Sequence, residues 1–246
     1  MGQYFEPQPG AASDPGEVSL DVAGRALQLA TDAGVFARNG IDRGTAVLLR
    51  KAPPPPLAGT LLDLGCGYGP IACALAAQAP DTAVWAVDVN ERARALTEEN
   101  AAANGLANVV VAGPGDIPPG VRFDAIYSNP PVRIGKDAMF ELVTGWLRRL
   151  VPHAENPIQR AERGGRGGRA FLVVQRHLGA DSFLTRLQRD GWLCERLASS
   201  KGYRVLVVAG RVTEELSDDP SVQRAGLTRF LPPTPDLGLP WPDAGT

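Results

Sequence analysis

A glycine-rich run near residue 65 follows a short apolar segment and has an acid at its start. The run spans residues 63–69 (DLGCGYG). Glycine lets the backbone adopt conformations closed to other residues and come close to a ligand, although a tight turn would need the same residues. Pro70 stands where loops of the dinucleotide-binding GxGxxG type have their third glycine. A carboxylate at Asp63 would repel a pyrophosphate, so the run favours a ligand with an amine or a cation.

Two more acids follow the next two expected strands. Asp88 comes about 25 residues after Asp63, which is one strand–helix–strand step. A carboxylate at that strand tip suits hydrogen bonds from the two hydroxyls of a ribose, and capping of the helix that begins near Glu91 is the alternative. Asp116 could accept a hydrogen bond from an adenine amine, or it could close a turn. These positions favour a nucleoside as the ligand.

A run of two prolines after an asparagine follows the fourth strand of the alternating region. The Asn129 carboxamide oxygen can accept a hydrogen bond from a planar amine. The Pro130 carbonyl, freed from strand pairing by the prolines, can be a second acceptor for the same amine. Two acceptors would fix the direction of the nitrogen lone pair, which is catalysis by positioning. An ordinary Asn-Pro turn is the alternative.

Short apolar runs alternate with helical segments from residue 60 onward. The pattern predicts an α/β, Rossmann-like fold with a seven-stranded, mostly parallel sheet, whose ligands bind at the carboxyl ends of the strands. The expected strands are 60–64, 83–87, 108–112, 123–128, 170–174, 193–197 and 204–209. The expected helices are 70–79, 91–104, 136–150 and 182–189.

The segments outside this region have other compositions. Residues 1–57 are expected to form an N-terminal module, because period-two alternation around Gly24 predicts a β-hairpin before a loop and a short helix from Thr45. Residues 58–211 are expected to form the α/β domain, with an Arg/Gly-rich insertion at 151–169. Residues 212–246 are an acidic, proline-rich and unpatterned tail.

The net charge of −2 excludes a basic coat over the whole protein. It does not exclude a local basic patch, because residues 148–176 hold seven arginines against two glutamates. Within the insertion, arginine recurs at every third residue from Arg160 to Arg169. Such guanidinium groups could contact RNA phosphates or bases, and a solvated insertion explains the same pattern.

The sequence shows no pattern typical of a metal site, a disulfide framework or a membrane span. The three cysteines (Cys66, Cys73 and Cys194) and two histidines show no ligand spacing, so we expect buried cysteines and no metal. No stretch reaches the about 18 consecutive apolar residues of a membrane span, and the start of the chain lacks the pattern of a signal peptide. A cytoplasmic protein is expected.

The glycine run with Asp88 downstream resembles the class I S-adenosylmethionine (SAM) methyltransferases, over roughly residues 58–210. The resemblance implies that residues 58–211 are a SAM-binding methyltransferase domain, with the loop beneath the methionine part of the cofactor and Asp88 on its ribose. SAM carries a sulfonium and an ammonium group but no phosphate, which fits an acid before the loop. The residues implied in cofactor binding are Asp63, Gly65, Cys66, Gly67, Gly69, Asp88, Val89, Asp116 and Asn129.

Residues 129–132 resemble the (Asn/Asp)-Pro-Pro-x signature of enzymes that methylate amines of nucleobases or of protein glutamine. Adenine-N6 and glutamine-N5 enzymes usually have an aromatic fourth residue for stacking, whereas this chain has Val132. The resemblance implies that Asn129 and Pro130 are catalytic and turn the lone pair of the target amine toward the SAM methyl.

A finer resemblance is to single-domain relatives of bacterial small-subunit rRNA guanine-N2 methyltransferases, the "methyltransferase small" domain. It rests on residues 4–5, 31–36, 40–45, 63–70, 88–90, 128–132, 135–136 and 200–205. It implies that Phe36, Gly44, Thr45, Pro131, Val132 and Lys201 lie near the donor or the target base. Hydrophobic filling by Phe36 and opening of the last strand by Lys201 are the alternatives.

The sequence therefore predicts a SAM-dependent N-methyltransferase of the exocyclic amine of a guanine in ribosomal RNA. The partner would be rRNA or the small ribosomal subunit, with the target base unpaired or flipped out. A methyltransferase of protein glutamine or of a small molecule is the alternative enzyme. A non-catalytic RNA-binding or assembly protein that kept the fold is the alternative outside enzymes, and Pro70 disfavours a nicotinamide dehydrogenase.

Overall fold

The computed structural model describes residues 12–152 and 167–211 of the 246-residue chain. Its elements, in chain order, are β1 (Gly16–Val22), β2 (Arg25–Thr31), α1 (Arg43–Lys51), β3 (Gly59–Leu64), α2 (Pro70–Gln78), β4 (Thr82–Val87), α3 (Glu91–Ala103), β5 (Val109–Ala112), β6 (Ala125–Ser128), η2 (Val132–Ile134), α4 (Lys136–Leu147), β7 (Arg169–Gln175), η3 (Arg176–Leu178), α6 (Ala180–Arg189), β8 (Trp192–Ser200) and β9 (Tyr203–Arg211).

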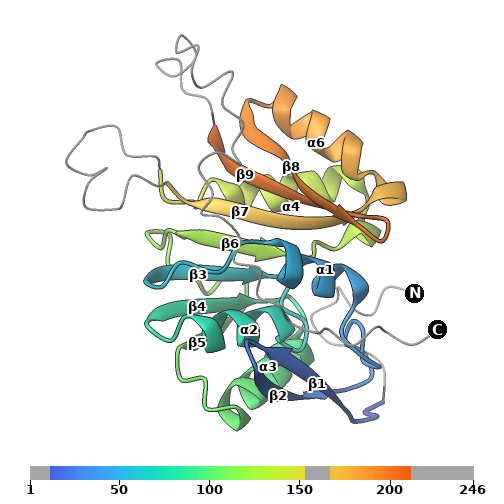
Figure 1. Ribbon diagram of the computed structural model, residues 1–246, viewed down its shortest axis with the longest axis vertical. Coiled ribbons are helices and arrows are strands. Elements are labelled where there is room, and N and C mark those ends of the chain that lie inside the picture. Colours follow the sequence, from blue (N-terminus) through green and yellow to red (C-terminus); the bar gives the residue numbers. More distant parts are fainter. Residues whose placement is uncertain (1–11, 153–166, 212–246) are drawn as a thin grey trace.

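Seven strands form one sheet in the order β5-β4-β3-β6-β7-β9-β8 (Figure 1). The five strands from β5 to β7 are parallel, whereas β9 runs antiparallel to both of its neighbours, β7 and β8. The predicted seven-stranded, mostly parallel α/β sheet is thus confirmed. Because β3, β4, β6 and β7 are parallel, the turns that follow them meet at one edge of the sheet.

Hydrophobic side chains alternate between the two faces of this sheet and fill two cores. Leu61 of β3 and Tyr127 of β6 belong to the core that α1, α2, α3 and the β1–β2 hairpin cover. Leu62 and Ile126, one residue along each strand, belong to the core under α4 and α6. The alternation follows from the two-residue repeat of a strand, and burial on both faces explains why these strands are apolar throughout.

The predicted N-terminal hairpin is present and is fixed to the edge of α3 by two asparagines. The Asn100 side chain donates to the carbonyl of Ala30 (2.9 Å) and accepts from its N–H (2.6 Å). Asn104 makes the same pair of bonds with Gln28, at 2.8 and 3.1 Å. Residues four apart on a helix and two apart on a strand lie on one face, so the two carboxamides pair with β2 as a neighbouring strand would. The hairpin therefore shares its core with the sheet domain.

Several element boundaries differ from the prediction. Helix α1 begins at Arg43, two residues before the expected Thr45, because the Asp42 carboxylate caps its N-terminus. Strand β6 is shorter than 123–128, and β8 extends beyond 193–197. The tail at 212–246 and most of the insertion at 151–169, with Arg160, Arg163 and Arg166, lie outside the described residues.

Candidate cofactor and substrate pocket

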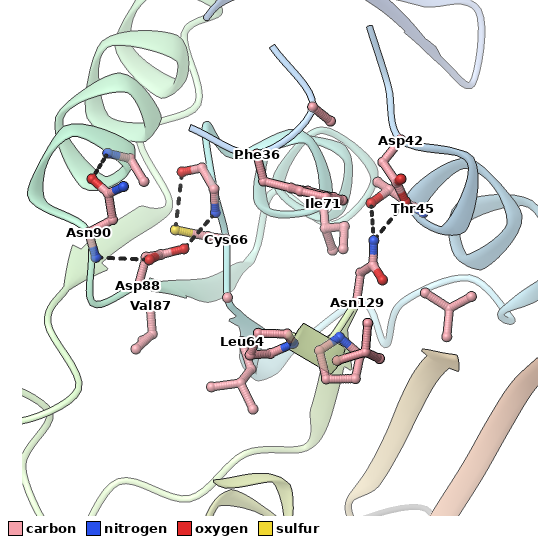
Figure 2. A pocket seen from close by; sticks show the side chains of 18 of the residues that line it. Phe36, Asp42, Thr45, Leu64, Cys66, Ile71, Val87, Asp88, Asn90 and Asn129 are labelled. Carbon is pink, nitrogen blue, oxygen red and sulfur yellow. Dashed lines mark hydrogen bonds between the residues drawn. The ribbon is translucent and has the colours of Figure 1, made fainter. Parts of the chain in front are cut away.

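One elongated pocket lies at the carboxyl ends of β3, β4, β6 and β7, with a cavity of about 300 Å³. Asp88, after β4, lines one end, and Asn129, after β6, lines the other (Figure 2). Phe36 and Ile71 lie between the two ends. Cavities of this size hold nucleoside-sized ligands. The tertiary structure thus joins the glycine run, the strand-tip acid and the Asn-Pro-Pro turn in one site.

The glycine run forms the floor of the pocket. The N–H groups of Gly65 and Cys66 both donate to the carbonyl of Val87, at 2.8 and 3.0 Å, which ties the loop to β4. Gly65 and Gly67 have positive φ, and a Cβ added to either would meet no atom within 4 Å. Because both glycines line the pocket, they keep open a space that a ligand can fill.

Gly69 has a structural function instead. Its φ is +90°, and an added Cβ would lie 2.9 Å from Cγ2 of Thr97 on α3. Gly69 is the N-cap residue of α2 and is not among the residues that line the pocket. Glycine at this position therefore lets the first turn of α2 pack against α3.

The Asp88 carboxylate connects the glycine loop to the turn after β4. It accepts from the N–H of Gly67 at 3.0 Å and from the N–H of Asn90 at 2.9 Å. Partial burial raises the pKa of this carboxyl, against the lowering effect of those hydrogen bonds. Each carboxylate oxygen of Asp88 can accept more than one hydrogen bond. Because the residue also lines the pocket, it can still accept from hydroxyl groups of a ligand. Val89, next in the chain, also lines the pocket.

Asp63 lies beneath the loop rather than in the pocket. Its side chain is fully buried, and Oδ2 accepts from the N–H of Ala72 at 2.9 Å, in the first turn of α2. Oδ1 has no hydrogen-bond partner among the described residues. Burial raises the pKa of Asp63 to about 8, although the Ala72 hydrogen bond opposes the increase. The carboxyl thus fixes the first turn of the helix that follows the loop. Its contact with a cofactor stays a prediction.

Asn129 is held in one orientation by residues of the N-terminal module. Its Nδ2 donates to Oδ2 of Asp42 at 2.8 Å and to Oγ1 of Thr45 at 3.2 Å. A carboxylate only accepts hydrogen bonds, so the amide nitrogen, and not the oxygen, must face Asp42. Oδ1 of Asn129 is therefore the atom that remains to accept a hydrogen bond from a ligand in the pocket.

Asp42 itself is fixed by the N-terminus of α1. The same Oδ2 accepts from the N–H groups of Gly44 at 2.7 Å and Thr45 at 3.1 Å. A Cβ on Gly44 would lie 2.9 Å from Oδ2 of Asp42, 3.0 Å from Cε1 of Tyr203 and 3.3 Å from Nδ2 of Asn129. Gly44 therefore allows α1, β6 and β9 to meet closely at this end of the pocket.

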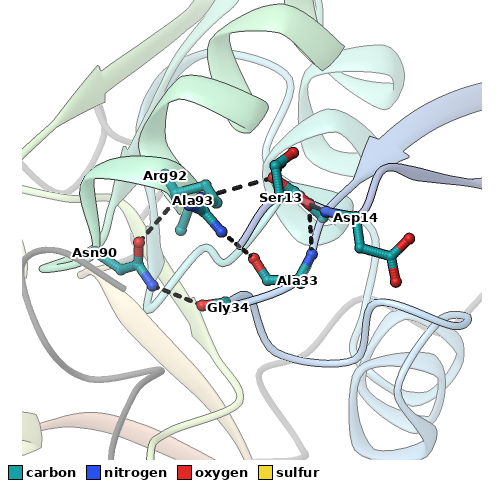
Figure 3. Close-up of polar contacts among 8 residues, drawn as sticks. Ser13, Asp14, Ala33, Gly34, Asn90, Arg92 and Ala93 are labelled. Carbon is teal, nitrogen blue, oxygen red and sulfur yellow. Dashed lines mark hydrogen bonds and ion pairs between the residues drawn. The ribbon is translucent and has the colours of Figure 1, made fainter. Parts of the chain in front are cut away.

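The loop that carries Phe36 is held to the other end of the pocket. Asn90 donates to the carbonyl of Gly34 at 3.0 Å, and Arg92 donates to the carbonyl of Ala33 at 2.6 Å (Figure 3). Phe36 lines the pocket with its side chain 42% exposed. The turn after Asp88 and the loop after the hairpin therefore form a single wall of the site.

Most of the predicted site residues line this pocket, and five do not, one of which is Gly44, packed behind Asn129 as described above. Those that line it are Phe36, Thr45, Gly65, Cys66, Gly67, Asp88, Val89, Asn129, Pro130, Pro131 and Val132. Asp63 and Gly69 lie behind the loop, as described above. Asp116 is exposed and its Oδ2 accepts from the N–H of Gly113 at 3.0 Å, which is the turn-closing alternative. Lys201 lies in the exposed turn between β8 and β9, so the structure does not bring it into the pocket.

Sequence reasoning missed several residues of the site. Asp42 carried one available signal, since an acid directly before Arg43-Gly44-Thr45 is a typical helix N-cap. Tyr203 and Gln175 are partners in the β7–β9 register, and both line the pocket. Tyr203 lies in the run 200–205 that carries the family resemblance, but nothing in the local sequence assigns Tyr203 or Gln175 to the pocket.

The three cysteines are buried, as expected. Within residues 12–152 and 167–211, no three His, Cys, Asp or Glu side chains are grouped as metal ligands would be. In the same part of the chain, no helix combines the length and the apolar character needed to cross a bilayer.

Comparisons with known proteins agree with this geometry. The family model for the methyltransferase small domain matches residues 26–207. The uncharacterized Bacillus subtilis protein YbxB is 29% identical over 206 residues, which are 82% of this chain and 96% of YbxB. Ribosomal RNA small subunit methyltransferase C of Shewanella loihica is 38% identical over 152 residues, 62% of this chain but only 41% of that protein. The chain thus spans about half, or less, of the curated rRNA methyltransferases that it matches.

Among solved structures, the 16S rRNA methyltransferase RsmC of T. thermophilus, in complex with AdoMet and guanosine, superposes with a TM-score of 0.62. The two chains are 23% identical, and the match covers 82% of this chain and 52% of that one. This likeness supports the fold. With the family match over residues 26–207, the chain belongs to the methyltransferase small domain family, whose cofactor is S-adenosylmethionine, as the sequence predicts.

Proposed function

We propose that this protein transfers the methyl group of SAM to the exocyclic amine of a guanine in ribosomal RNA. The observation that carries the proposal is the fixed carboxamide of Asn129, whose nitrogen is held by Asp42 and Thr45. An acceptor oxygen presented in a pocket suits a substrate that donates N–H bonds, as an exocyclic amine does.

The pocket fits SAM by the chemistry of its lining. The open space over Gly65 and Gly67 gives close backbone approach, and the Asp88 carboxylate is placed to accept from ribose hydroxyls. Oδ1 of Asp63 has no partner among the described residues, and a cationic ligand in the pocket would favour the ionised form of this carboxyl, whose pKa burial raises to about 8. When bound, SAM supplies an electrophilic methyl group on its sulfonium.

At the other end of the pocket, the chain's own residues position the target amine. Oδ1 of Asn129 and the carbonyl of Pro130 each accept a hydrogen bond from one of the two N–H groups of the amine. These two bonds turn the nitrogen lone pair toward the end of the pocket that binds SAM. Both acceptors also stabilise the positive charge that develops on the nitrogen during transfer. No strong base is needed, because the proton can leave once the nitrogen is cationic.

Two observations favour a guanine of rRNA over the alternative substrates, and a third supports a nucleobase. Several relatives are named ribosomal RNA small subunit methyltransferase C. The residue after Asn-Pro-Pro is Val132, whereas adenine-N6 and glutamine-N5 enzymes usually have an aromatic residue there. Phe36 and Tyr203 nevertheless supply two aromatic rings to the pocket, on which a flipped base can stack. An rRNA substrate also places the enzyme in the cytoplasm.

The test is methyl transfer from labelled SAM to naked rRNA, isolated ribosomal subunits and total protein in parallel. We expect label in small-subunit rRNA that appears, after digestion to nucleosides, as N2-methylguanosine. Label found only in protein would overturn the rRNA assignment and support a glutamine target. SAM binding without transfer to any fraction would favour an assembly protein that kept the fold.

A further inference from the structure

Five exposed basic side chains gather at the sheet edge around the Asn129 end of the pocket. They come from four parts of the chain: the start of α1, the segment from η2 to the start of α4, the start of η3 and the β8–β9 turn. The residues are Arg43, Arg133, Lys136, Arg176 and Lys201. We call this set the cationic rim.

Contacts between these segments show that the rim is continuous. The N–H of Arg176 donates to the carbonyl of Gly202 at 2.8 Å, which places η3 beside the turn that carries Lys201. A Cβ on Gly44, the residue after Arg43, would lie 3.0 Å from Cε1 of Tyr203, so the start of α1 lies beside the start of β9.

The rim continues on its other side to the mouth of the pocket. Cε of Lys136 lies 3.2 Å from the position of a Cβ on Gly179, the residue that follows η3. Lys136 begins α4 directly after η2, and Arg133 of η2 lines the pocket itself. The rim therefore runs from α1 through β9 and η3 to the catalytic turn.

The charges of the rim are not neutralised by neighbouring acids. Among the described residues, none of the five forms an ion pair. The acids of the same segments already have partners: Asp42 accepts from three donors, Asp137 pairs with Arg186, and Asp181 pairs with Arg204. The rim thus presents to solvent five basic side chains that no described carboxylate holds in an ion pair.

The opposite end of the pocket differs. There the Arg94 guanidinium donates to the carbonyls of Asp88 and Val89, and Arg92 donates to the carbonyl of Ala33. These cations are held against the backbone of the protein. Positive charge available to a ligand is therefore concentrated on the substrate side of the pocket and not on the cofactor side.

We propose that the cationic rim binds the sugar-phosphate backbone of an RNA strand on both sides of the target nucleotide. Lysine and arginine contacts to phosphates supply affinity and orientation without reading sequence. With the backbone held between α1 and α4, one base can turn inward to Asn129. The choice of RNA rests on the proposed function, whereas the phosphate contacts can be tested without methyl transfer.

The experiment compares two triple variants that lose the same charge. The first is Arg43→Gln/Arg176→Gln/Lys201→Gln, three rim residues outside the pocket lining. The matched control is Arg122→Gln/Arg148→Gln/Arg189→Gln, three exposed arginines located before β6 or at the C-terminal ends of α4 and α6, at the other edge of the sheet. Binding of a fluorescein-labelled single-stranded 20-nucleotide RNA is measured by anisotropy between 50 and 200 mM salt.

We expect the rim variant to bind the RNA about 10- to 100-fold more weakly at 100 mM salt. The slope of log K against log salt should be smaller in magnitude by about 2 in this variant, because three phosphate contacts are lost and each contact to a single strand contributes about 0.7. The control should bind like the wild type, and all three proteins should keep the same SAM affinity and melting temperature. An equal loss of RNA affinity in the two variants, or no loss in the rim variant, would refute the proposal that the rim binds the backbone. Tighter binding of a DNA oligonucleotide of the same sequence would refute the choice of RNA.

The outcome is separable from the proposed function. If the wild-type protein binds RNA through the rim but methylates no rRNA, RNA binding by the rim stands and the proposed reaction is refuted. If the wild-type protein methylates rRNA while the rim variant binds RNA normally, the reaction stands and RNA binding by the rim is refuted.

Discussion

Replacing Asp42 by serine should separate the orientation of Asn129 from the stability of α1. Serine is as good an N-cap residue as aspartate, so the Gly44 and Thr45 N–H groups keep an acceptor. The shorter side chain, however, no longer reaches Nδ2 of Asn129, which lies 2.8 Å from the present carboxylate oxygen. The variant therefore frees the carboxamide to turn, with little change elsewhere.

The magnitude follows from the bond that is lost. A hydrogen bond to a charged group contributes about 1.5–3 kcal/mol. If that contribution holds the carboxamide in its reactive orientation, its loss raises the barrier by the same amount and lowers the turnover number about 10- to 100-fold. We expect SAM affinity and the melting temperature to stay close to those of the wild type, because Asp42 is at the end of the pocket far from Asp88.

The assay is single-turnover methyl transfer from labelled SAM, with calorimetry for SAM binding and thermal unfolding for stability. Asp42→Asn is the matched variant, since its carboxamide oxygen can accept both the cap bonds and the Asn129 bond, and it should recover turnover to within about fivefold. Asp21→Ser, at an exposed carboxylate in the hairpin turn, controls for loss of charge. Wild-type turnover in Asp42→Ser, or an Asp42→Asn variant as slow as Asp42→Ser, would refute the orientation argument.

Three further predictions test other parts of the structure. Asn129→Ala should lower turnover at least about 100-fold while SAM affinity, measured by calorimetry, changes less than about threefold, and equal losses in both would remove Asn129 from its assigned position in the reaction. Asn100→Ala should lower the free energy of unfolding in urea by about 2–4 kcal/mol, because both backbone groups of Ala30 lose their partner; a change below about 0.5 kcal/mol would contradict the strand-like pairing. The raised pKa of Asp63, about 8, means that the folded protein holds this proton more tightly than the unfolded chain, so the contribution of this group to stability is fully present below about pH 4 and is lost as the pH rises toward 8. Urea unfolding at pH 5 and pH 8 should show this loss in the wild type but not in Asp63→Asn, and parallel losses in the two proteins would show that Asp63 is not the group that titrates.

Much of the fold could be predicted because the signals are local. The two-residue alternation around Gly24 defines the hairpin, and Asn104 with Gly105, whose φ is positive, ends α3 where expected. The apolar runs of the parallel strands depend only on burial at both faces of the sheet. The boundaries that moved, such as the start of α1, depend on capping by single side chains.

The site residues, like the fold, could be predicted only where the signal is local. The glycine loop, Asp88 and the Asn-Pro-Pro turn could be found in the sequence, because each needs particular residue types at the tip of a strand. Lys201 lies outside the pocket lining, because the antiparallel pairing of β8 with β9 puts it in an exposed turn, and its contact with the target base stays a prediction.

The fold class, the glycine loop and the Asn-Pro-Pro turn can be predicted from the sequence, because backbone torsion preferences and the burial of neighbouring residues encode them. The contact of Asp42 with Asn129, 87 residues away, and the position of Tyr203 at the same end of the pocket are apparent in the folded protein alone. Those contacts exist because α1 packs against β7 and β9, and the packing of distant segments has no local signature in the chain.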